Sequence, residues 1–276
     1  MLYVFVVGLL MGLANLIPGV SGGTIALIGG VYEKLISAVA SLSSLRFDKR
    51  QILFISVLGA GIVVGIVGFS KLMGVALQSF PSLMYGAFSG LVLGSSPIVL
   101  RKIRKRSLFS VVAFSLGALI VLVIAFSGVR PENSGVLTHN ISSLFYDFVA
   151  GFIGAAAMVL PGLSGAFILL IMGEYSRAIS AVSERDLIII TFIGFGVLTG
   201  IVLISKLMKI LLKKYQDQTF SFLLGMMAGS IPDLLTRTGE ETRLPLLFTG
   251  MAAGIIFSLA LLKLERWHKR SSVMVD

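Results

Sequence analysis

Two stretches of the chain decide its fold: GLANLIPGVSGGTIALIGGVYEKLI at 12–36 and AAAMVLPGLSGAFILLIMGEYSRAI at 155–179. When their Pro-Gly pairs are superposed, 11 of 25 positions are identical. The match continues from 59–73 onto 194–208, with 9 of 15 identities, and from 90–97 onto 225–232, with 4 of 8. The chain is therefore a duplication of a unit of about 140 residues, with a first unit at 1–143 and a second at 144–276.

The composition places both units in a membrane. Of the 276 residues, 56% are hydrophobic and only 13% are charged, with a mean hydropathy of +1.00. Soluble proteins have about 25% charged residues, so too little polar surface remains for a water-soluble fold. The absence of cysteine excludes disulfides, iron–sulfur clusters and thiolate nucleophiles. The two histidines, His139 and His268, are far apart in sequence, and we expect neither a metal nor a cofactor.

Apolar runs predict an all-α polytopic membrane protein. A helix needs about 20 apolar residues to cross the hydrocarbon layer. We predict full spans at about 51–74, 82–100, 108–130, 187–211, 218–236 and 245–265. The regions 2–42 and 144–182 are also apolar, but Pro18-Gly19 and Pro161-Gly162 break each of them into two arms.

The leading arms are short for a full crossing, so we expect each broken region to be a re-entrant hairpin. Two crossings are the open alternative. A break at membrane depth persists only where it is buried in protein or lines an aqueous cavity.

Each unit crosses the membrane an odd number of times under either alternative, so the second unit must be inverted relative to the first. Inverted repeats are a recurrent construction of secondary transporters. The odd count puts 16 of the 23 basic residues on one face, together with both termini. The positive-inside rule makes that face cytoplasmic. The net charge of +10 thus marks topology, and we expect no nucleic-acid partner.

The breaks are candidate anion sites. PGVSGGT at 18–24 and PGLSGAF at 161–167 place small residues just before a new helical arm. Free backbone N–H groups and the positive end of the helix dipole favour an anion there, although small residues also serve close helix packing. No Lys-Ser/Thr pair follows, which argues against a nucleotide. The candidate residues are Pro18, Gly19, Ser21, Gly22, Gly23, Thr24, Pro161, Gly162, Ser164 and Gly165.

Ionisable residues near the apolar runs are further candidates, because burying them is costly. Tyr32, Glu33 and Lys34 follow the first break, and Tyr175 and Arg177 follow the second. Glu33 is either a proton-coupling carboxylate, a partner of the broken turn, or an interfacial group paired with a cation.

Two lysines also superpose in the repeat: Lys71 falls on Lys206 within a shared Ser-Lys-Leu-Met. They either bind phosphate at opposite faces or extend to the lipid headgroups. Asp147 and Asp233 lie near span ends and are expected at the interface.

The doubled Pro-Gly-x-Ser-Gly motif with its downstream Gly-x-Tyr resembles a bacterial membrane family long known only as a domain of unknown function, the polyprenyl-phosphate transporters with PopT-type undecaprenyl phosphate translocases. The resemblance covers essentially the whole chain. It implies return of undecaprenyl phosphate from the outer to the inner leaflet of the cytoplasmic membrane, for reuse in cell-wall synthesis. It also implies a site role for the motif positions, including Gly30 and Gly173.

Residues and resemblance together predict a transporter and not an enzyme, since we find no paired carboxylates at fixed spacing and no nucleophile–base pair. We expect the two breaks to meet and hold a lipid phosphate, with its tail between spans, while one unit rocks against the other. Coupling to protons or sodium, and assembly into a homo-oligomer, are left open. The alternatives are an ion-coupled carrier of a small anion, a lipid-modifying membrane enzyme, and an assembly factor that does not transport.

Overall fold

The computed structural model describes residues 1–17, 20–42, 48–105, 107–127, 137–238 and 242–273, and these are helical apart from their connections. The helices of the first unit are α1 (Leu2–Asn15), α2 (Gly22–Ile28), α3 (Tyr32–Leu42), α4 (Lys49–Ser79), α5 (Pro81–Leu100) and α6 (Leu108–Phe126). Those of the second are α7 (Ile141–Val159), α8 (Gly165–Ile171), α9 (Tyr175–Ser183), α10 (Leu187–Lys214), α11 (Gln216–Thr236) and α12 (Leu244–Val273).

All six predicted spans are confirmed as helices long and apolar enough to cross a membrane: α4, α5, α6, α10, α11 and α12. Within the described ranges α7 also meets this criterion, which brings the total to seven. Its counterpart α1 has 14 residues and is shorter than a span. The chain is therefore a multi-pass membrane protein.

The second arm of each broken region differs from the prediction of one continuous helix. The chain bends a second time in each region, by 118° between α2 and α3 and by 105° between α8 and α9. The bends fall at Gly30 and Gly173, which have φ values of +64° and +73°. Glycine adopts this left-handed conformation without the steric cost that a Cβ imposes. Each broken region thus has three helices.

Glycines bring the long helices together in four pairs: α1 with α4, α7 with α10, α5 with α12, and α6 with α11. A Cβ on Gly86 or Gly90 of α5 would collide with the backbone of α12, and one on Gly250 or Gly254 of α12 would collide with α5. The other three interfaces contain equivalent glycines, which are Gly8, Gly12, Gly61, Gly65, Gly117, Gly151, Gly196, Gly200, Gly225 and Gly229. Such close backbone approach replaces the hydrophobic driving force that lipid does not supply.

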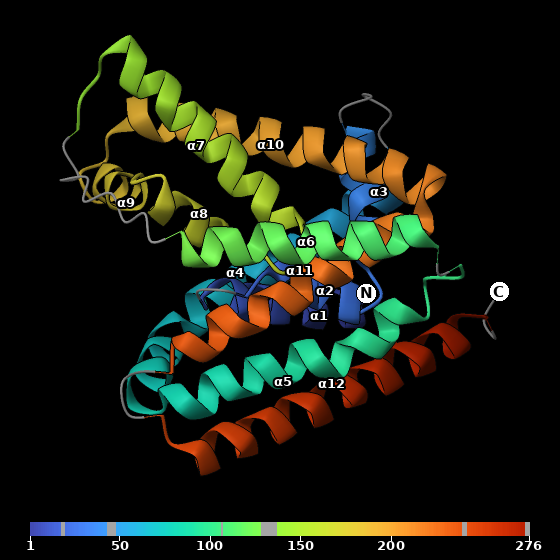
Figure 1. Ribbon diagram of the computed structural model, residues 1–276. Coiled ribbons are helices and arrows are strands. Elements are labelled where there is room, and N and C mark those ends of the chain that lie inside the picture. Colours follow the sequence, from blue (N-terminus) through green and yellow to red (C-terminus); the bar gives the residue numbers. More distant parts are fainter. Residues whose placement is uncertain (18–19, 43–47, 106, 128–136, 239–241, 274–276) are drawn as a thin grey trace.

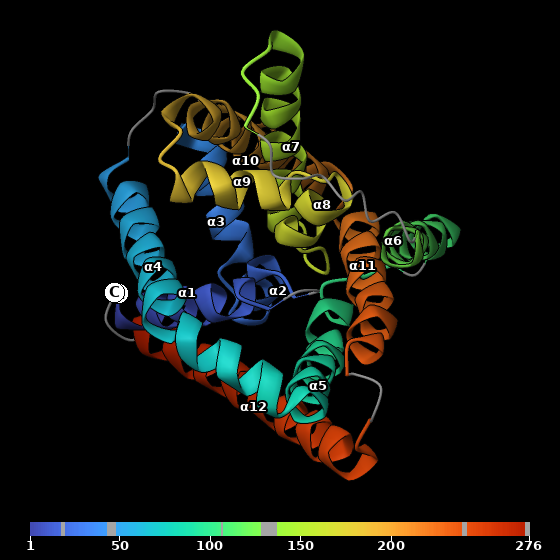
Figure 2. The ribbon, with the colours of Figure 1, turned by 90° about the vertical axis from the view of Figure 1, so that its left-hand side faces the viewer.

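Two of the four pairs join the units. α5 and α6 belong to the first unit, and their partners α12 and α11 belong to the second. Figure 1 shows α5 beside α12 and α7 beside α10, and Figure 2 shows the four pairs around the short helix α2. The units are interlocked, and α2 lies inside the ring with all seven of its residues buried.

The structural correspondence extends beyond the stretches that reveal the repeat. The Tyr3 hydroxyl on α1 donates to the Gly29 carbonyl at 2.8 Å, and the Tyr146 hydroxyl on α7 donates to the Met172 carbonyl at 2.9 Å. Both bonds tie the leading helix of a unit to the bend after its second helix. The same local fold is thus built twice, while the inverted orientation of whole units stays a prediction.

Candidate functional site

The two breaks contact each other inside the ring of helices. Ser21, the N-cap of α2, is buried, and its hydroxyl faces the carbonyls of Met158 and Leu160 at 3.1 and 3.2 Å. The same oxygen accepts the N–H of Gly23 at 3.1 Å. The start of α2 is therefore held against the end of α7, as expected for breaks that meet.

A second bond completes this contact. The Gly162 N–H donates to Thr24 Oγ1 at 3.2 Å. Gly162 has a φ of +91°, and a Cβ there would lie 2.6 Å from the carbonyl carbon of Met226 on α11. The second break is thus pressed between α2 and the middle of α11.

The predicted anion donors are occupied in this arrangement. Gly22 N–H donates to the Asn15 side chain at 2.8 Å, Gly23 N–H to Ser21, and Phe167 N–H to Ser164 at 3.4 Å. The breaks form a closed contact here, and these three N–H groups are bonded to acceptors within their own breaks. Pro18 and Gly19 lie outside the described residues.

A cavity of about 500 Å³ lies at one end of α11, which we call the Arg237 cavity. Arg237 binds Asp233 through Nε and Nη2, both at 3.0 Å, and its guanidinium lies 4.7 Å from the centre of the Phe167 ring. The two N–H groups of Nη1 make no hydrogen bond with the described residues. The Arg237 cavity is lined by Tyr85, Ile124, Ala125, Ser127, Phe167, Leu170, Ile171, Asp233, Thr236 and Arg237.

The opposite end of α11 carries a related arrangement. Lys102, just after α5, pairs with Glu33 at 2.7 Å and lies 5.7 Å from the centre of the Phe220 ring. The register that places 90–97 on 225–232 also places Lys102 on Arg237 and Tyr85 on Phe220. Each cation therefore lies near the aromatic residue of the other unit, because α5 and α11 pack antiparallel.

The break contact lies between these two ends. Met226, which touches the second break, follows Phe220 by six residues and precedes Asp233 by seven. At 1.5 Å per residue these separations are about 9 and 10 Å along α11. A cation and an aromatic ring thus flank the closed contact on either side.

The remaining predicted residues are dispersed. Glu33 is half exposed and paired with Lys102. Lys34 lies over the Phe54 ring at 4.6 Å. Lys71 and Lys206 are exposed, away from the break contact. Tyr175 is exposed, whereas Tyr32 is buried and its hydroxyl has no partner among the described residues.

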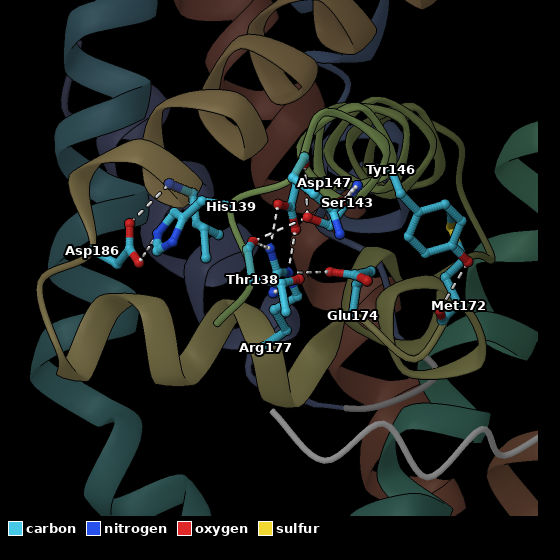
Figure 3. Close-up of polar contacts among 11 residues, drawn as sticks. Thr138, His139, Ser143, Tyr146, Asp147, Met172, Glu174, Arg177 and Asp186 are labelled. Carbon is cyan, nitrogen blue, oxygen red and sulfur yellow. Dashed lines mark hydrogen bonds and ion pairs between the residues drawn. The ribbon is translucent and has the colours of Figure 1, made fainter. Parts of the chain in front are cut away.

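A cluster of buried charges in the second unit was not predicted. Arg177 donates from Nε and Nη2 to Asp147 at 2.8 and 2.9 Å, and Nη2 also donates to the Thr138 carbonyl at 2.7 Å. Glu174 lies beside them, 3.6 Å from Arg177 Nε. Figure 3 shows the three charged side chains converging from α7, the α8–α9 turn and α9. Asp147 is fully buried by protein.

A second pair lies next to this cluster, where Asp186 caps α10 and binds His139 Nε2 at 2.7 Å. Desolvation raises the pKa of Asp186, but hydrogen bonds from Ile189 N–H and His139 outweigh it, and the net pKa is lowered. The carboxylate is therefore favoured at the cap, where it binds the first free N–H groups of α10.

Sequence reasoning missed Arg237, Lys102 and Asp233 as site residues, because it counted the two cations as loop charges and placed Asp233 at the interface. Extending the repeat register by a few residues would have paired Lys102 with Arg237. Asp147 and Glu174 had no such signal, since Val4 and Val31 occupy the matching positions of the first unit.

These features define a class: a polytopic helical membrane protein whose two broken helical regions meet in the interior, in the manner of secondary transporters. Residues 11–247 match the family described as VCA0040-like, undecaprenyl phosphate translocase-like, and the chain belongs to this family. It is a member of a transporter family and not an enzyme.

Two curated relatives agree with this assignment. The chain is 33% identical over 239 residues to a polyprenyl-phosphate transporter of Vibrio cholerae serotype O1, covering 82% of this chain and 75% of the relative. It is 31% identical over 271 residues to a polyprenyl-phosphate transporter of Staphylococcus aureus, covering 94% of each. No solved structure gives a significant match.

Proposed function

We propose that the chain carries undecaprenyl phosphate from the outer to the inner leaflet of the bacterial cytoplasmic membrane, so that the lipid carrier is reused in cell-wall polymer synthesis. The observation that carries this proposal is the placement of Arg237 and Lys102 on either side of a closed contact between the two breaks. Family membership and the two named relatives support the same substrate class.

The Arg237 cavity is the entry site for the phosphate. The loop charges put this end of α11 on the outer side and the Lys102 end, with both termini, on the cytoplasmic side. A guanidinium matches phosphate oxygens with paired N–H donors. The Asp233 carboxylate holds Arg237 in place by accepting hydrogen bonds from Nε and Nη2. The N–H groups of Arg237 Nη1 remain available to bind the lipid phosphate.

The prenyl tail stays in the bilayer during transport. The cavity is lined on one side by α6 and on another by α8, and α6 packs against α11. Val123 and Phe126 on α6 and Leu170 on α8 are exposed apolar side chains at this edge. The tail leaves the cavity between α6 and α8, where it meets only apolar surface and avoids the cost of exposure to water.

The movement that passes the phosphate is confined to the broken hairpins. Rocking of whole units would separate α5 from α12 and α6 from α11, whose backbones are in contact at glycines. Among the described residues, the contact between the breaks is held by hydrogen bonds from the Ser21 hydroxyl to the Met158 and Leu160 carbonyls and from the Gly162 N–H to Thr24. Opening it frees the Ser21 hydroxyl and the Gly162 N–H for the phosphate on its way to Lys102.

Depletion of the protein in cells, scored by undecaprenyl phosphate exposed at the cell surface, tests this function. We expect the exposed lipid to accumulate and wild-type protein to reverse the effect. Arg237→Gln should fail to reverse it, whereas Arg243→Gln, which changes an exposed cation of the following loop, should succeed.

The same assay separates the alternatives. Normal surface levels after depletion would contradict the proposal, and full rescue by Arg237→Gln would contradict the site. Uptake of free phosphate into proteoliposomes that lack the lipid would favour a small-anion carrier. Release of inorganic phosphate from the lipid would favour an enzyme.

A further inference from the structure

Among the described residues around the bend at Gly173, the buried charges are not balanced. Asp147, Glu174 and Arg177 are 0%, 4% and 6% exposed, so two acids share one cation away from water. Asp147 accepts two hydrogen bonds from Arg177, at 2.8 and 2.9 Å. Glu174 receives only the 3.6 Å contact, and its Oε2 has no hydrogen-bond partner among the described residues.

This arrangement favours one proton on the pair of acids. The carboxyl groups of Asp147 and Glu174 both contact Arg177 Nε, at 2.8 and 3.6 Å, so the two acids lie close together. Two carboxylates in one site hold a proton between them because like charges repel. An ionised Glu174 would also be a buried charge without a dedicated partner, which is costly. Arg177 donates two hydrogen bonds to Asp147 and only a 3.6 Å contact reaches Glu174, so the proton is placed on Glu174.

We propose that Glu174 is a proton-binding site whose ionisation moves the α8–α9 hairpin and thereby links lipid transport to protons. The inference rests on the proposed function for its role in transport, but the proton site itself can be tested without transport.

Among the residues that the structure describes, no second cation contacts Glu174. From α7, Tyr146 faces the turn, but its hydroxyl is committed to the Met172 carbonyl. From the start of α10, Asp186 faces Arg177 and is itself paired with His139. Within the described part of the chain, Arg177 is therefore the one cation that contacts Glu174.

Glu174 is coupled to the Arg237 cavity through α8. It follows Ile171 by three residues, and Phe167, Leu170 and Ile171 all line the cavity. Loss of the proton gives the cluster a net negative charge. Glu174 then moves toward water or competes with Asp147 for Arg177, and either change displaces the turn at Gly173 and with it α8. Protonation thus fixes the wall of the cavity that faces the lipid phosphate.

The test uses the absence of cysteine in this chain. A Ser176→Cys variant carries an environment-sensitive fluorophore on the exposed side of α9, in nanodiscs without undecaprenyl phosphate. We expect fluorescence to change in a single step between acidic and alkaline buffer. Glu174→Gln in this background should abolish the step, and Glu184→Gln, at the exposed end of α9, should preserve it.

A flat titration in the Ser176→Cys background, or an unchanged step after Glu174→Gln, would overturn the proton site. If Glu174→Gln does not insert into the membrane, Glu174→Asp is tested instead. A shift in the pH midpoint of its fluorescence titration supports the proton site, and an unchanged midpoint overturns it. A normal titration in a protein that moves no lipid would overturn the proposed function alone.

Discussion

Thr24→Val removes the acceptor that holds the second break closed while it keeps the shape of the side chain. Thr24 is buried, and its Oγ1 is 3.2 Å from the Gly162 nitrogen. Gly162 is pressed against the α11 backbone, so its N–H cannot turn toward another partner. A buried donor left without an acceptor costs about 1–3 kcal/mol. The contact should therefore open about 5- to 150-fold more often.

Hydrogen–deuterium exchange of the peptide that contains Gly162 measures this opening. We expect exchange to rise by that factor in Thr24→Val and to stay near wild type in Thr24→Ser, which retains the oxygen. Peptides from α5 and α12 report on the scaffold and should not change. Unaltered exchange at Gly162 in Thr24→Val would refute the claim that this bond closes the path.

Three further variants test the scaffold and the charges. Arg177→Met should destabilise the fold by about 3–5 kcal/mol in detergent unfolding, since it leaves buried acids without a cation, and adding Asp147→Leu should restore most of the loss. Gly254→Val should abolish folded, monodisperse protein in size-exclusion chromatography, because its side chain would collide with α5, whereas Gly68→Val meets open space and should elute as wild type. Lys71→Gln should retain full lipid transport in proteoliposomes, because Lys71 is exposed away from the break contact, and a loss would restore it as a site residue.

Spans and breaks could be predicted because their signals are local. An apolar run of sufficient length becomes a helix in lipid whatever its partners, and Pro-Gly interrupts a helix wherever it occurs. The bends at Gly30 and Gly173 could not be predicted in the same way. A glycine inside an apolar run is compatible with a continuous helix, and only the φ imposed by packing shows that the chain turns there.

Most of the candidate site depends on contacts between distant segments. Lys102 belongs to a basic loop and differs from its neighbours only in the partners that the fold provides, Glu33 and Phe220. The sequence alone does not distinguish Lys102 from the other basic residues of its loop. Pairing of α5 with α11 selects one cation from each unit, and that pairing is a property of the tertiary structure.

The two units repeat the backbone but not the charge, and this difference assigns them different tasks. The Tyr3 and Tyr146 bonds show the shared framework at equivalent bends. Around the second bend the chain places Asp147, Glu174 and Arg177, where the first unit has Val4, Val31 and Lys34. The first unit builds the same bend without buried acids, so the bend itself does not require them. A proton site in a single unit gives the two hairpins unequal responses to pH, which allows one to open while the other stays closed.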